Sequence, residues 1–200
     1  MLESATRTTT LLLDDLRDSD NAPAWEEFDS RYRPIVAGMA RRLGLTEHDA
    51  ADAAQETMVR FLREYRAGKY DRTRGRLRAW VAVIARSCIA DLRRARARVR
   101  VARGESAMPD LPASEEMERM WDEELRETLL RRADEALRKD TRLDEKTIRA
   151  FELLAVKGLG VKEAAEELGM TVESVYKARS RCLKQLRAIV EELTAAYEAA

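Results

Sequence analysis

The segment from Val161 to Cys182 carries side chains suited to contacting DNA. It reads VKEAAEELGMTVESVYKARSRC, in which a short apolar helix pattern is followed by one glycine and by a second helix rich in polar and basic residues. Lys and Arg bind phosphates and guanine edges, and Ser and Thr hydrogen-bond to either. The side chains expected to project outward from the second helix are Glu173, Tyr176, Lys177, Ser180 and Lys184, flanked by Arg179 and Arg181. This segment therefore predicts a helix that reads the major groove.

The spacing within this segment is typical of a helix-turn-helix. Ala165 provides a small residue where two helices cross, Gly169 can turn the chain, and Val175 can anchor the second helix. Thr171 can cap that helix. An ordinary helical hairpin with a solvated outer face is the alternative. The lack of acidic partners for the basic residues on that face favours DNA binding.

A second candidate site lies on the helix that Thr46 can cap. Opposite its apolar stripe it carries Asp49, Asp52, Glu56, Arg60 and Arg63. Carboxylates at this spacing could line a metal site, but a di-metal bundle uses Glu-x-x-His pairs from several helices, and His48 is the only histidine. Cys88 and Cys182 match no metal-ligand or redox spacing. We therefore expect no metal or other cofactor, two reduced buried cysteines, and a solvated face or a flat polar docking surface on this helix.

The charge distribution indicates a polyanion partner for one part of the chain. The 37 Lys and Arg balance the 37 Asp and Glu. Between Arg60 and Gly104, however, fifteen basic residues are opposed by three acidic ones, and the sign then reverses. The acidic residues crowded after this point are Glu115, Glu116, Glu118, Asp122, Glu123, Glu124 and Glu127. Such asymmetry suggests nucleic-acid binding by the basic part, with a pair of solvated charged helix faces as the alternative.

A long helix expected from Leu77 places arginines opposite an apolar stripe. The arginines expected on its outer side are Arg86, Arg93, Arg94 and Arg100, and they suit a phosphate backbone. The ring of Trp80 could stack on a base. Because Trp80 falls within the apolar stripe, a core position is the favoured interpretation.

Helices must position all of these side chains. The sequence has no run of alternating β-branched residues, and Ala, Leu, Glu and Arg dominate it, which predicts an all-α fold. One helix is expected from Trp25 to Tyr32, and Pro34 can open a separate one that runs to Leu43. The stretch GESAMPDLPAS has too little apolar content to offset its ordering entropy and is predicted to be a linker.

The expected organisation is two small helical domains joined by a flexible linker. An N-terminal extension (1–21) precedes the first domain (22–100), and the linker (101–113) leads to the second domain (114–200), which ends in the helix-turn-helix. The N-terminal LLLDDLRD contains too short an apolar run for a signal peptide or a membrane span. A cytoplasmic protein without membrane insertion is therefore expected.

These segments, in this order, resemble bacterial RNA polymerase sigma factors of the extracytoplasmic function group. The resemblance covers almost the whole chain. In the first domain it rests on AWEEFDSRYRPIV, DAADAAQETMVRFL and YDRTRGRLRAWVAVIARSCIADLRR. In the second it rests on AFELLAVKGLGVKEAAEELGMTVESVYKARSRCLKQLR. It implies that the two domains are like sigma region two and sigma region four.

The resemblance also implies three sets of contacts. Docking on the coiled-coil clamp of the polymerase β′ subunit would fall to Asp49, Asp52, Gln55, Glu56 and Arg60. Binding of the minus-ten element, with flipped nontemplate bases held near the loop from Lys69 to Arg76, would fall to Arg72, Arg74, Arg76, Arg86, Asp91, Arg93 and Arg94. Recognition of the minus-thirty-five element would fall to Thr171, Glu173, Ser174, Tyr176, Lys177, Ser180 and Arg181. The implied partners are core RNA polymerase, through its β′ clamp and β flap, promoter DNA, and an anti-sigma factor or another regulator.

The function that follows is a sigma factor that gives core RNA polymerase its promoter specificity, by binding rather than by catalysis. A stand-alone helix-turn-helix regulator is the alternative, and it predicts tight duplex binding without polymerase and a palindromic site. A helical metalloenzyme using Asp49, Asp52 and Glu56 is a third class, for which the sequence offers no convergent nucleophile, base or phosphate loop. The charge of the acidic region from Ser114 to Glu127 suggests one further hypothesis, that this region keeps the free protein off DNA.

Overall fold

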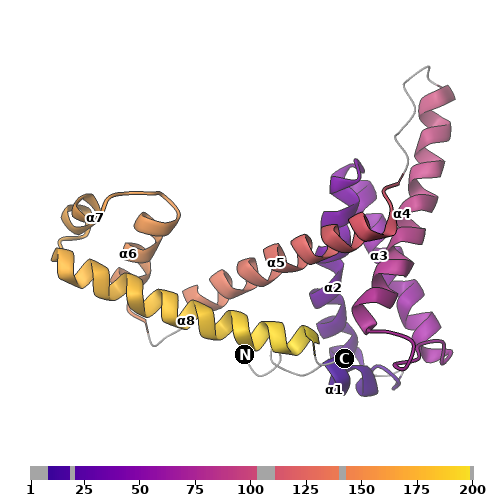
Figure 1. Ribbon diagram of the computed structural model, residues 1–200, viewed down its shortest axis with the longest axis horizontal. Coiled ribbons are helices and arrows are strands. Elements are labelled where there is room, and N and C mark those ends of the chain that lie inside the picture. Colours follow the sequence, from indigo (N-terminus) through magenta and orange to yellow (C-terminus); the bar gives the residue numbers. More distant parts are fainter. Residues whose placement is uncertain (1–8, 19–20, 103–110, 140–142, 199–200) are drawn as a thin grey trace. The chain divides into compact units, whose positions relative to one another are not determined.

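The computed structural model describes residues 9–18, 21–102, 111–139 and 143–198, and within these ranges the secondary structure is eight α-helices with no strand. The all-α prediction is confirmed. The described residues form two compact units (Figure 1). One contains the residues before Leu129 together with Tyr197, and the other contains Leu129–Ala196.

The first unit is built on three long helices that lie alongside one another, α2 (Ala22–Arg42), α3 (Glu47–Arg66) and α4 (Leu77–Ala102). Aromatic rings fill the space between them. Phe28 of α2 stacks on Phe61 of α3 with 4.2 Å between ring centroids, and Phe61 meets the edge of Trp80 of α4 at 5.3 Å. Such ring pairs add to the free energy gained by burying their area. They fix the spacing of the helices that carry the candidate site.

The expectation of two helices separated at Pro34 is wrong, because α2 is continuous. Asn21 begins the helix by accepting a hydrogen bond from the Ala24 amide at 3.2 Å. A proline inside a helix removes one backbone hydrogen bond and costs ~3 kcal/mol or more. The face of α2 that includes Tyr32, Ile35 and Val36 is fully buried on both sides of the proline, so tertiary packing outweighs this local cost.

The segment assigned to an N-terminal extension contains a helix, α1 (Thr9–Asp15), that packs on the first unit. Leu12 and Leu13 are buried. The Tyr65 hydroxyl donates a hydrogen bond to the Leu13 carbonyl at 2.7 Å, and Arg66 Nε donates to the Leu16 carbonyl at 3.2 Å. The LLLDDL pattern was the available signal, since its leucines recur on one side of a helix.

The predicted linker lies largely outside the described residues, which exclude 103–110. Its first two residues belong to α4, which continues through Ala102, and residues 111–113 form no helix. The next helix is α5 (Ser114–Arg138), whose residues up to Thr128 belong to the first unit.

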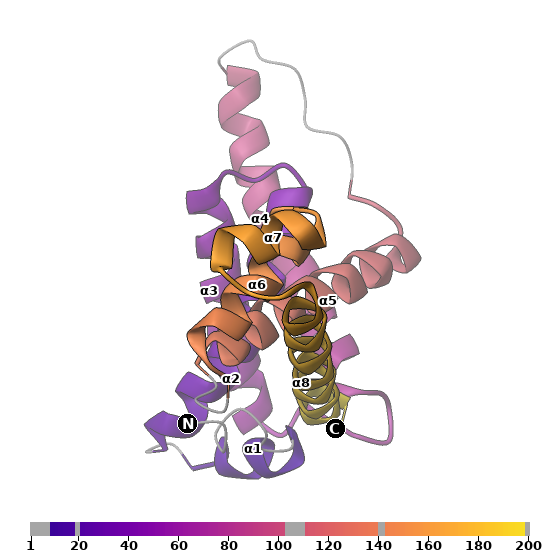
Figure 2. The same ribbon diagram turned by 90° about the vertical axis from the view of Figure 1, so that its left-hand side faces the viewer.

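The second unit contains the rest of α5, α6 (Glu145–Ala155), α7 (Val161–Leu168) and α8 (Val172–Glu198) as far as Ala196. Asp144 caps α6 by accepting the Thr147 amide hydrogen bond at 2.8 Å. Figures 1 and 2 show α6 and α7 beside the first part of α8. Leu153, Ala164, Ala165 and Val175 form the shared core of these three helices, which confirms the expected small residue and apolar anchor of a helix-turn-helix.

The turn between α7 and α8 depends on Gly169, which is left-handed with φ of 61°. We expect Gly169→Val to lower the free energy of unfolding by about 1–3 kcal/mol, because a β-branched residue is strained there. Chemical denaturation would measure the loss. Gly75→Val is the matched control, since Gly75 has no positive φ and no atom within contact of an added Cβ. Equal losses in both variants would contradict this account of the turn.

Candidate interfaces for polymerase and nucleic acid

The outer face of α3 presents an exposed acidic and polar surface. Thr46 begins the helix by accepting the Asp49 amide hydrogen bond at 3.2 Å. Further along, Asp52, Gln55 and Glu56 are all exposed. Asp52 lies 3.5 Å from the imidazole of His48, one turn earlier. The structure therefore brings three of the five predicted docking residues together on one solvent-facing side.

Asp49, unlike these three residues, is covered by a neighbouring helix. Its side chain is buried and forms an ion pair with Arg96 of α4, with Arg96 Nε 2.9 Å from Asp49 Oδ1. Burial opposes ionisation of Asp49, but the hydrogen bonds from Arg96 and Thr46 outweigh it and lower the pKa of this carboxyl group. Asp49 thus holds the start of α3 against α4.

Arg60, the fifth predicted docking residue, is half-buried. Its guanidinium donates hydrogen bonds to Glu64 at 3.1 Å and to the Ser87 hydroxyl of α4 at 3.2 Å. Its position therefore stabilises the α3–α4 packing beside the acidic surface.

The loop between α3 and α4 forms one wall of a pocket of about 310 Å³. Tyr70 stacks on Trp80 with 5.2 Å between centroids, and both rings are half-buried. The Tyr70 hydroxyl lies 3.4 Å from the Gly75 carbonyl across the loop. Burial raises the pKa of Tyr70, an effect that Arg72 partly opposes, so at neutral pH the side chain is an uncharged phenol. The pocket therefore offers aromatic surface inside a basic loop.

The shape of this loop comes from a local turn. The Asp71 carboxylate accepts hydrogen bonds from the Thr73 hydroxyl at 2.7 Å and from the Thr73 amide at 2.9 Å. These two bonds lower the pKa of Asp71 and keep it ionised. The predicted DNA-binding residues of the loop, Arg72, Arg74 and Arg76, are all exposed.

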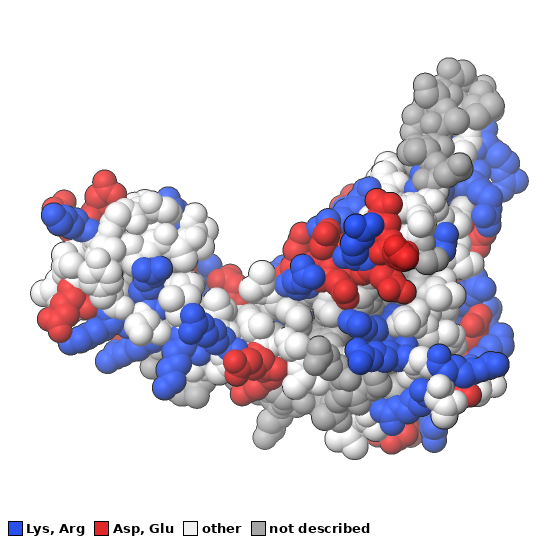
Figure 3. Space-filling model, viewed as in Figure 1, with Lys and Arg blue, Asp and Glu red and all other residues white. Residues whose placement is uncertain are grey.

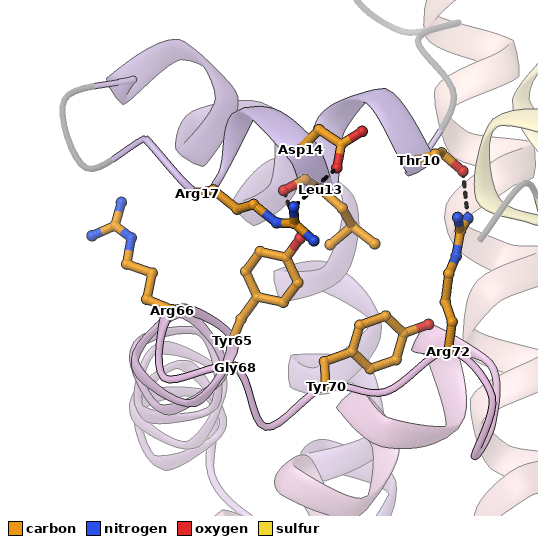
Figure 4. Close-up of a pocket in the computed structure, with 9 residues that line it drawn as sticks. All are labelled: Thr10, Leu13, Asp14, Arg17, Tyr65, Arg66, Gly68, Tyr70 and Arg72. Atoms are coloured by element: carbon orange, nitrogen blue, oxygen red, sulfur yellow. Dashed lines mark hydrogen bonds and ion pairs between the residues drawn. The ribbon is translucent and has the colours of Figure 1, made fainter.

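Helix α1 supports the same loop from the other side. Arg72 donates a hydrogen bond to the Thr10 hydroxyl at 2.5 Å. Figure 4 shows Tyr70 and Arg72 facing α1 across a cavity of about 450 Å³, with Leu13 and Arg17 on its far side. The loop is therefore held between α1 and the aromatic contact with α4.

The four predicted DNA-binding residues of α4 do not share one surface. Arg94 is exposed and forms an ion pair with Asp91 one turn earlier. Arg86 is half-buried, and its guanidinium lies 3.4 Å from the Pro112 carbonyl. The expectation that Arg93 lies on the outer side is wrong, because it is 6% exposed. Arg93 follows buried Ile89 by four residues, which puts both on one side of the helix.

The start of α8 presents the predicted reading surface of the helix-turn-helix. Thr171 accepts the Ser174 amide hydrogen bond at 3.1 Å and so caps the helix. Val175, Ala178 and Cys182 are buried. Ser174 is half-buried, and the remaining predicted residues are exposed, namely Thr171, Glu173, Tyr176, Lys177, Ser180 and Arg181. Figure 3 shows Lys and Arg gathered along one side of this helix.

Two aromatic residues that line the loop pocket are not among the DNA-binding residues predicted from the sequence. For Trp80 the core is the favoured interpretation and base stacking the alternative; its ring contacts Phe61 and also lines the loop pocket. Tyr70 lies within the loop predicted to hold flipped bases, Lys69 to Arg76, but only the arginines of that loop are predicted to bind DNA. An aromatic residue among charged loop residues was the signal that could have singled it out.

Among the described residues, no three His, Cys, Asp or Glu side chains are placed to hold a metal ion. The carboxylate of Asp49 points to Arg96 rather than toward Asp52 and Glu56. Both cysteines are free and buried, as expected. Within the described ranges, the helices are too short or too polar to cross a bilayer.

Comparison with known proteins agrees with this geometry. Residues 28–99 match the family Sigma-70 region 2, and residues 141–186 match Sigma-70, region 4. A relative, the ECF RNA polymerase sigma factor SigE of Mycolicibacterium smegmatis, is 27% identical over 188 residues, covering 90% of this chain and 66% of the relative. The chain thus spans just under two thirds of the length of that relative.

A solved structure, that of CnrH in complex with the cytosolic domain of CnrY, is also similar to this chain. The sequences are 24% identical, the TM-score is 0.37, and the match covers 90% of this chain and 96% of the other chain.

The two Sigma-70 matches fall on different units. The first includes α3, α4 and the basic loop, and the second includes the helix-turn-helix. With both regions present in this order, the chain belongs to the sigma-70 family, and along most of its length it is similar to a member of the extracytoplasmic function group.

Proposed function

We propose that this chain is a sigma factor that binds core RNA polymerase and directs it to a specific set of promoters. The observation that carries the proposal is the pair of surfaces found together on the first unit. It combines an exposed acidic surface on α3 with a basic loop that encloses an aromatic pocket. A stand-alone duplex-binding protein needs neither of these features.

The α3 surface is proposed to dock on the β′ clamp of the polymerase. Asp52, Gln55 and Glu56 supply hydrogen-bond acceptors and negative charge for a basic partner surface. Val59 lies on the same helix and is 50% exposed, which adds apolar area to that surface. Asp49 and Arg60 act behind this surface, because they tie α3 to α4.

The loop pocket is proposed to hold an unpaired base of the minus-ten element. Tyr70 and Trp80 provide stacking surface, and Arg72, Arg74 and Arg76 surround the pocket with positive charge for the strand backbone. A pocket that accepts only an unstacked base binds the open promoter and not the closed one. Melting is then driven by preferential binding of the open state.

The exposed start of α8 is proposed to read the minus-thirty-five element in duplex DNA, with the polymerase β flap as the partner that holds this unit. The protein contributes binding and positioning and no catalytic step of its own. An anti-sigma factor is a further proposed partner, and the family resemblance is what supports it.

Promoter binding with and without polymerase tests this function against a stand-alone regulator. Labelled promoter duplex would be titrated with the protein, with core polymerase, and with both together. The proposal predicts stable, sequence-specific complexes only when both proteins are present. Tight duplex binding by the protein alone, on a palindromic site, would instead support the regulator.

Lys177 of α8 is expected to contact a DNA phosphate. Its side chain is 65% exposed, and its ammonium group lies 2.7 Å from a carboxylate oxygen of Glu173, so the expectation that the basic residues of this face lack acidic partners is wrong for Lys177. We expect Lys177→Ala to weaken polymerase-dependent promoter binding on all sequences and to reduce the slope of log K against log salt by about one. Lys146→Ala, which removes an exposed lysine of α6, is the control. An unchanged salt slope with an altered sequence preference would show that Lys177 reads a base instead.

A further inference from the structure

The first half of α5 packs on the unit that carries the proposed polymerase and minus-ten sites. We call residues 114–128 the acidic segment. Its buried side chains are Met117, Trp121, Glu124 and Thr128, which recur at helical spacing. Trp121 contacts Tyr32 of α2, with 6.3 Å between ring centroids. The acidic segment thus docks through one defined face.

Arg42 of α2 is the centre of this contact. Its guanidinium pairs with Glu123 and Glu127, each at 2.6 Å, and also with Glu124. Glu124 is 6% exposed and lies over Gly38, where an added Cβ would come within 1.7 Å of the carboxylate. One arginine therefore holds three carboxylates, and the lack of a side chain at position 38 leaves room for one of them.

The other side of the acidic segment meets the arginines around the start of α4. Asp122 forms an ion pair with Arg78 at 3.3 Å. Glu118 and Asp122 line a cavity of about 180 Å³ together with Arg76, one of the proposed minus-ten residues. Figure 3 shows acidic side chains interspersed with basic ones over this half of α5. Carboxylates and phosphates use the same guanidinium donors, so Arg78 cannot pair with Asp122 and bind a DNA phosphate with the same donors, and the carboxylates beside Arg76 place negative charge next to a proposed minus-ten residue.

Docking of the acidic segment buries one polar group that has no partner within the described ranges. The indole N–H of Trp121 is buried without a hydrogen-bond acceptor among the described residues. Burying an unsatisfied donor is unfavourable, and release of the segment would return this group to water. The contact therefore combines charge pairing with one unfavourable burial that release of the segment would relieve.

We propose that the acidic segment is a self-bound competitor of promoter DNA. In the free protein it pairs with Arg78 and places carboxylates beside Arg76, and DNA gains full access to these two arginines only when the segment leaves. This inference rests on the proposed function for the identity of the DNA site. It gives the charge asymmetry of the sequence a specific structural basis. The apparent DNA affinity of the free protein is then the intrinsic affinity multiplied by the fraction of molecules in which the segment is detached.

Two kinds of variant test the proposal in the full chain without polymerase. Gly38→Leu places a side chain where the Glu124 carboxylate lies and changes no charge. Glu123→Gln with Glu127→Gln removes two exposed partners of Arg42. Its matched control is Glu115→Gln with Glu116→Gln, which removes the same charge from exposed positions of the same helix, away from the Arg42 pairs.

The measurement is fluorescence anisotropy of a labelled single-stranded oligonucleotide of the minus-ten type. We expect Gly38→Leu and the Glu123/Glu127 variant to bind at least about fivefold more tightly than the unaltered protein. The Glu115/Glu116 control should show only a small gain from general charge. Acrylamide quenching of tryptophan fluorescence should rise in the first two variants. Adding Trp121→Phe to each protein should abolish this difference in quenching between the variants and the unaltered protein.

Equal gains in the two glutamate variants would overturn the proposal, because charge alone would then explain the effect. Absence of DNA binding by every variant would also overturn it, since removing a competitor must reveal the site. If circular dichroism shows that Gly38→Leu does not fold, the two glutamate variants decide the question. Transcription with core polymerase is measured separately, so failure of the sigma-factor proposal is distinguishable from failure of this one.

Discussion

Reversing two carboxylates on α3, Asp52→Arg with Glu56→Arg, is expected to abolish polymerase-dependent transcription. Both side chains are exposed on the face proposed to dock on the β′ clamp. Placing like charges opposite each other at an interface costs several kcal/mol, which corresponds to a loss of about 100-fold or more in affinity. Binding of labelled protein to core polymerase would measure the loss directly, and run-off transcription would report its consequence.

The control for this variant reverses two exposed carboxylates elsewhere, Glu26→Arg with Glu145→Arg. It changes net charge equally and leaves α3 intact. The thermal stability of both variants should remain close to that of the unaltered protein, because none of the four positions is buried. Equal loss of polymerase binding in the two variants would contradict the assignment of the docking face to α3.

Removal of the Tyr70 ring is expected to cause the second-largest loss, and to affect promoter opening rather than promoter binding. Tyr70 stacks on Trp80 and lines the loop pocket. Stacking of a base on an aromatic ring contributes ~1–3 kcal/mol, so Tyr70→Ala should reduce open-complex formation about 10- to 100-fold. Permanganate reactivity of unpaired thymines, at saturating holoenzyme, would measure the open fraction.

Tyr70→Phe separates stacking from the hydroxyl contact with the Gly75 carbonyl. We expect this variant to retain most of the opening, because the distance of 3.4 Å makes that hydrogen bond weak. If Tyr70→Ala instead weakened closed-complex binding as much as opening, the pocket would not be selective for the melted strand, and the proposed role of this loop would be wrong.

The helix-turn-helix could be predicted closely from the sequence because its determinants are local. Gly169 is the left-handed turn residue, Thr171 caps α8, and Val175 is buried. Each of these roles depends on residues within a few positions along the chain. The exposed reading surface of α8 follows from the same helical periodicity.

Residues whose roles depend on distant partners could not be placed in this way. Asp49 fits the exposed side of α3 by spacing alone, but Arg96, 47 residues away, draws it into the α3–α4 contact. Arg93 carries a charge that suggested solvent, yet its helical position follows the buried side of α4. Pro34 has a local preference to begin a helix, and the burial of α2 overrides it.

The docking of α5 on α2 could not be predicted from the sequence for a similar reason. The crowd of acidic residues is plain in the sequence, but their partner Arg42 lies more than 80 residues earlier. Charge alone suggested that this region opposes DNA binding. Only the contacts with Arg42 and Arg78 show which arginines are involved.

The central claim is tested most directly by abortive initiation on a promoter library. Purified protein would be added to sigma-free bacterial core polymerase, with core polymerase alone as the control. We predict short transcripts from a defined set of promoters only when the protein is present, and their loss in the Asp52→Arg, Glu56→Arg variant. No transcripts across the library, combined with tight duplex binding by the protein alone, would contradict the claim and support a stand-alone regulator.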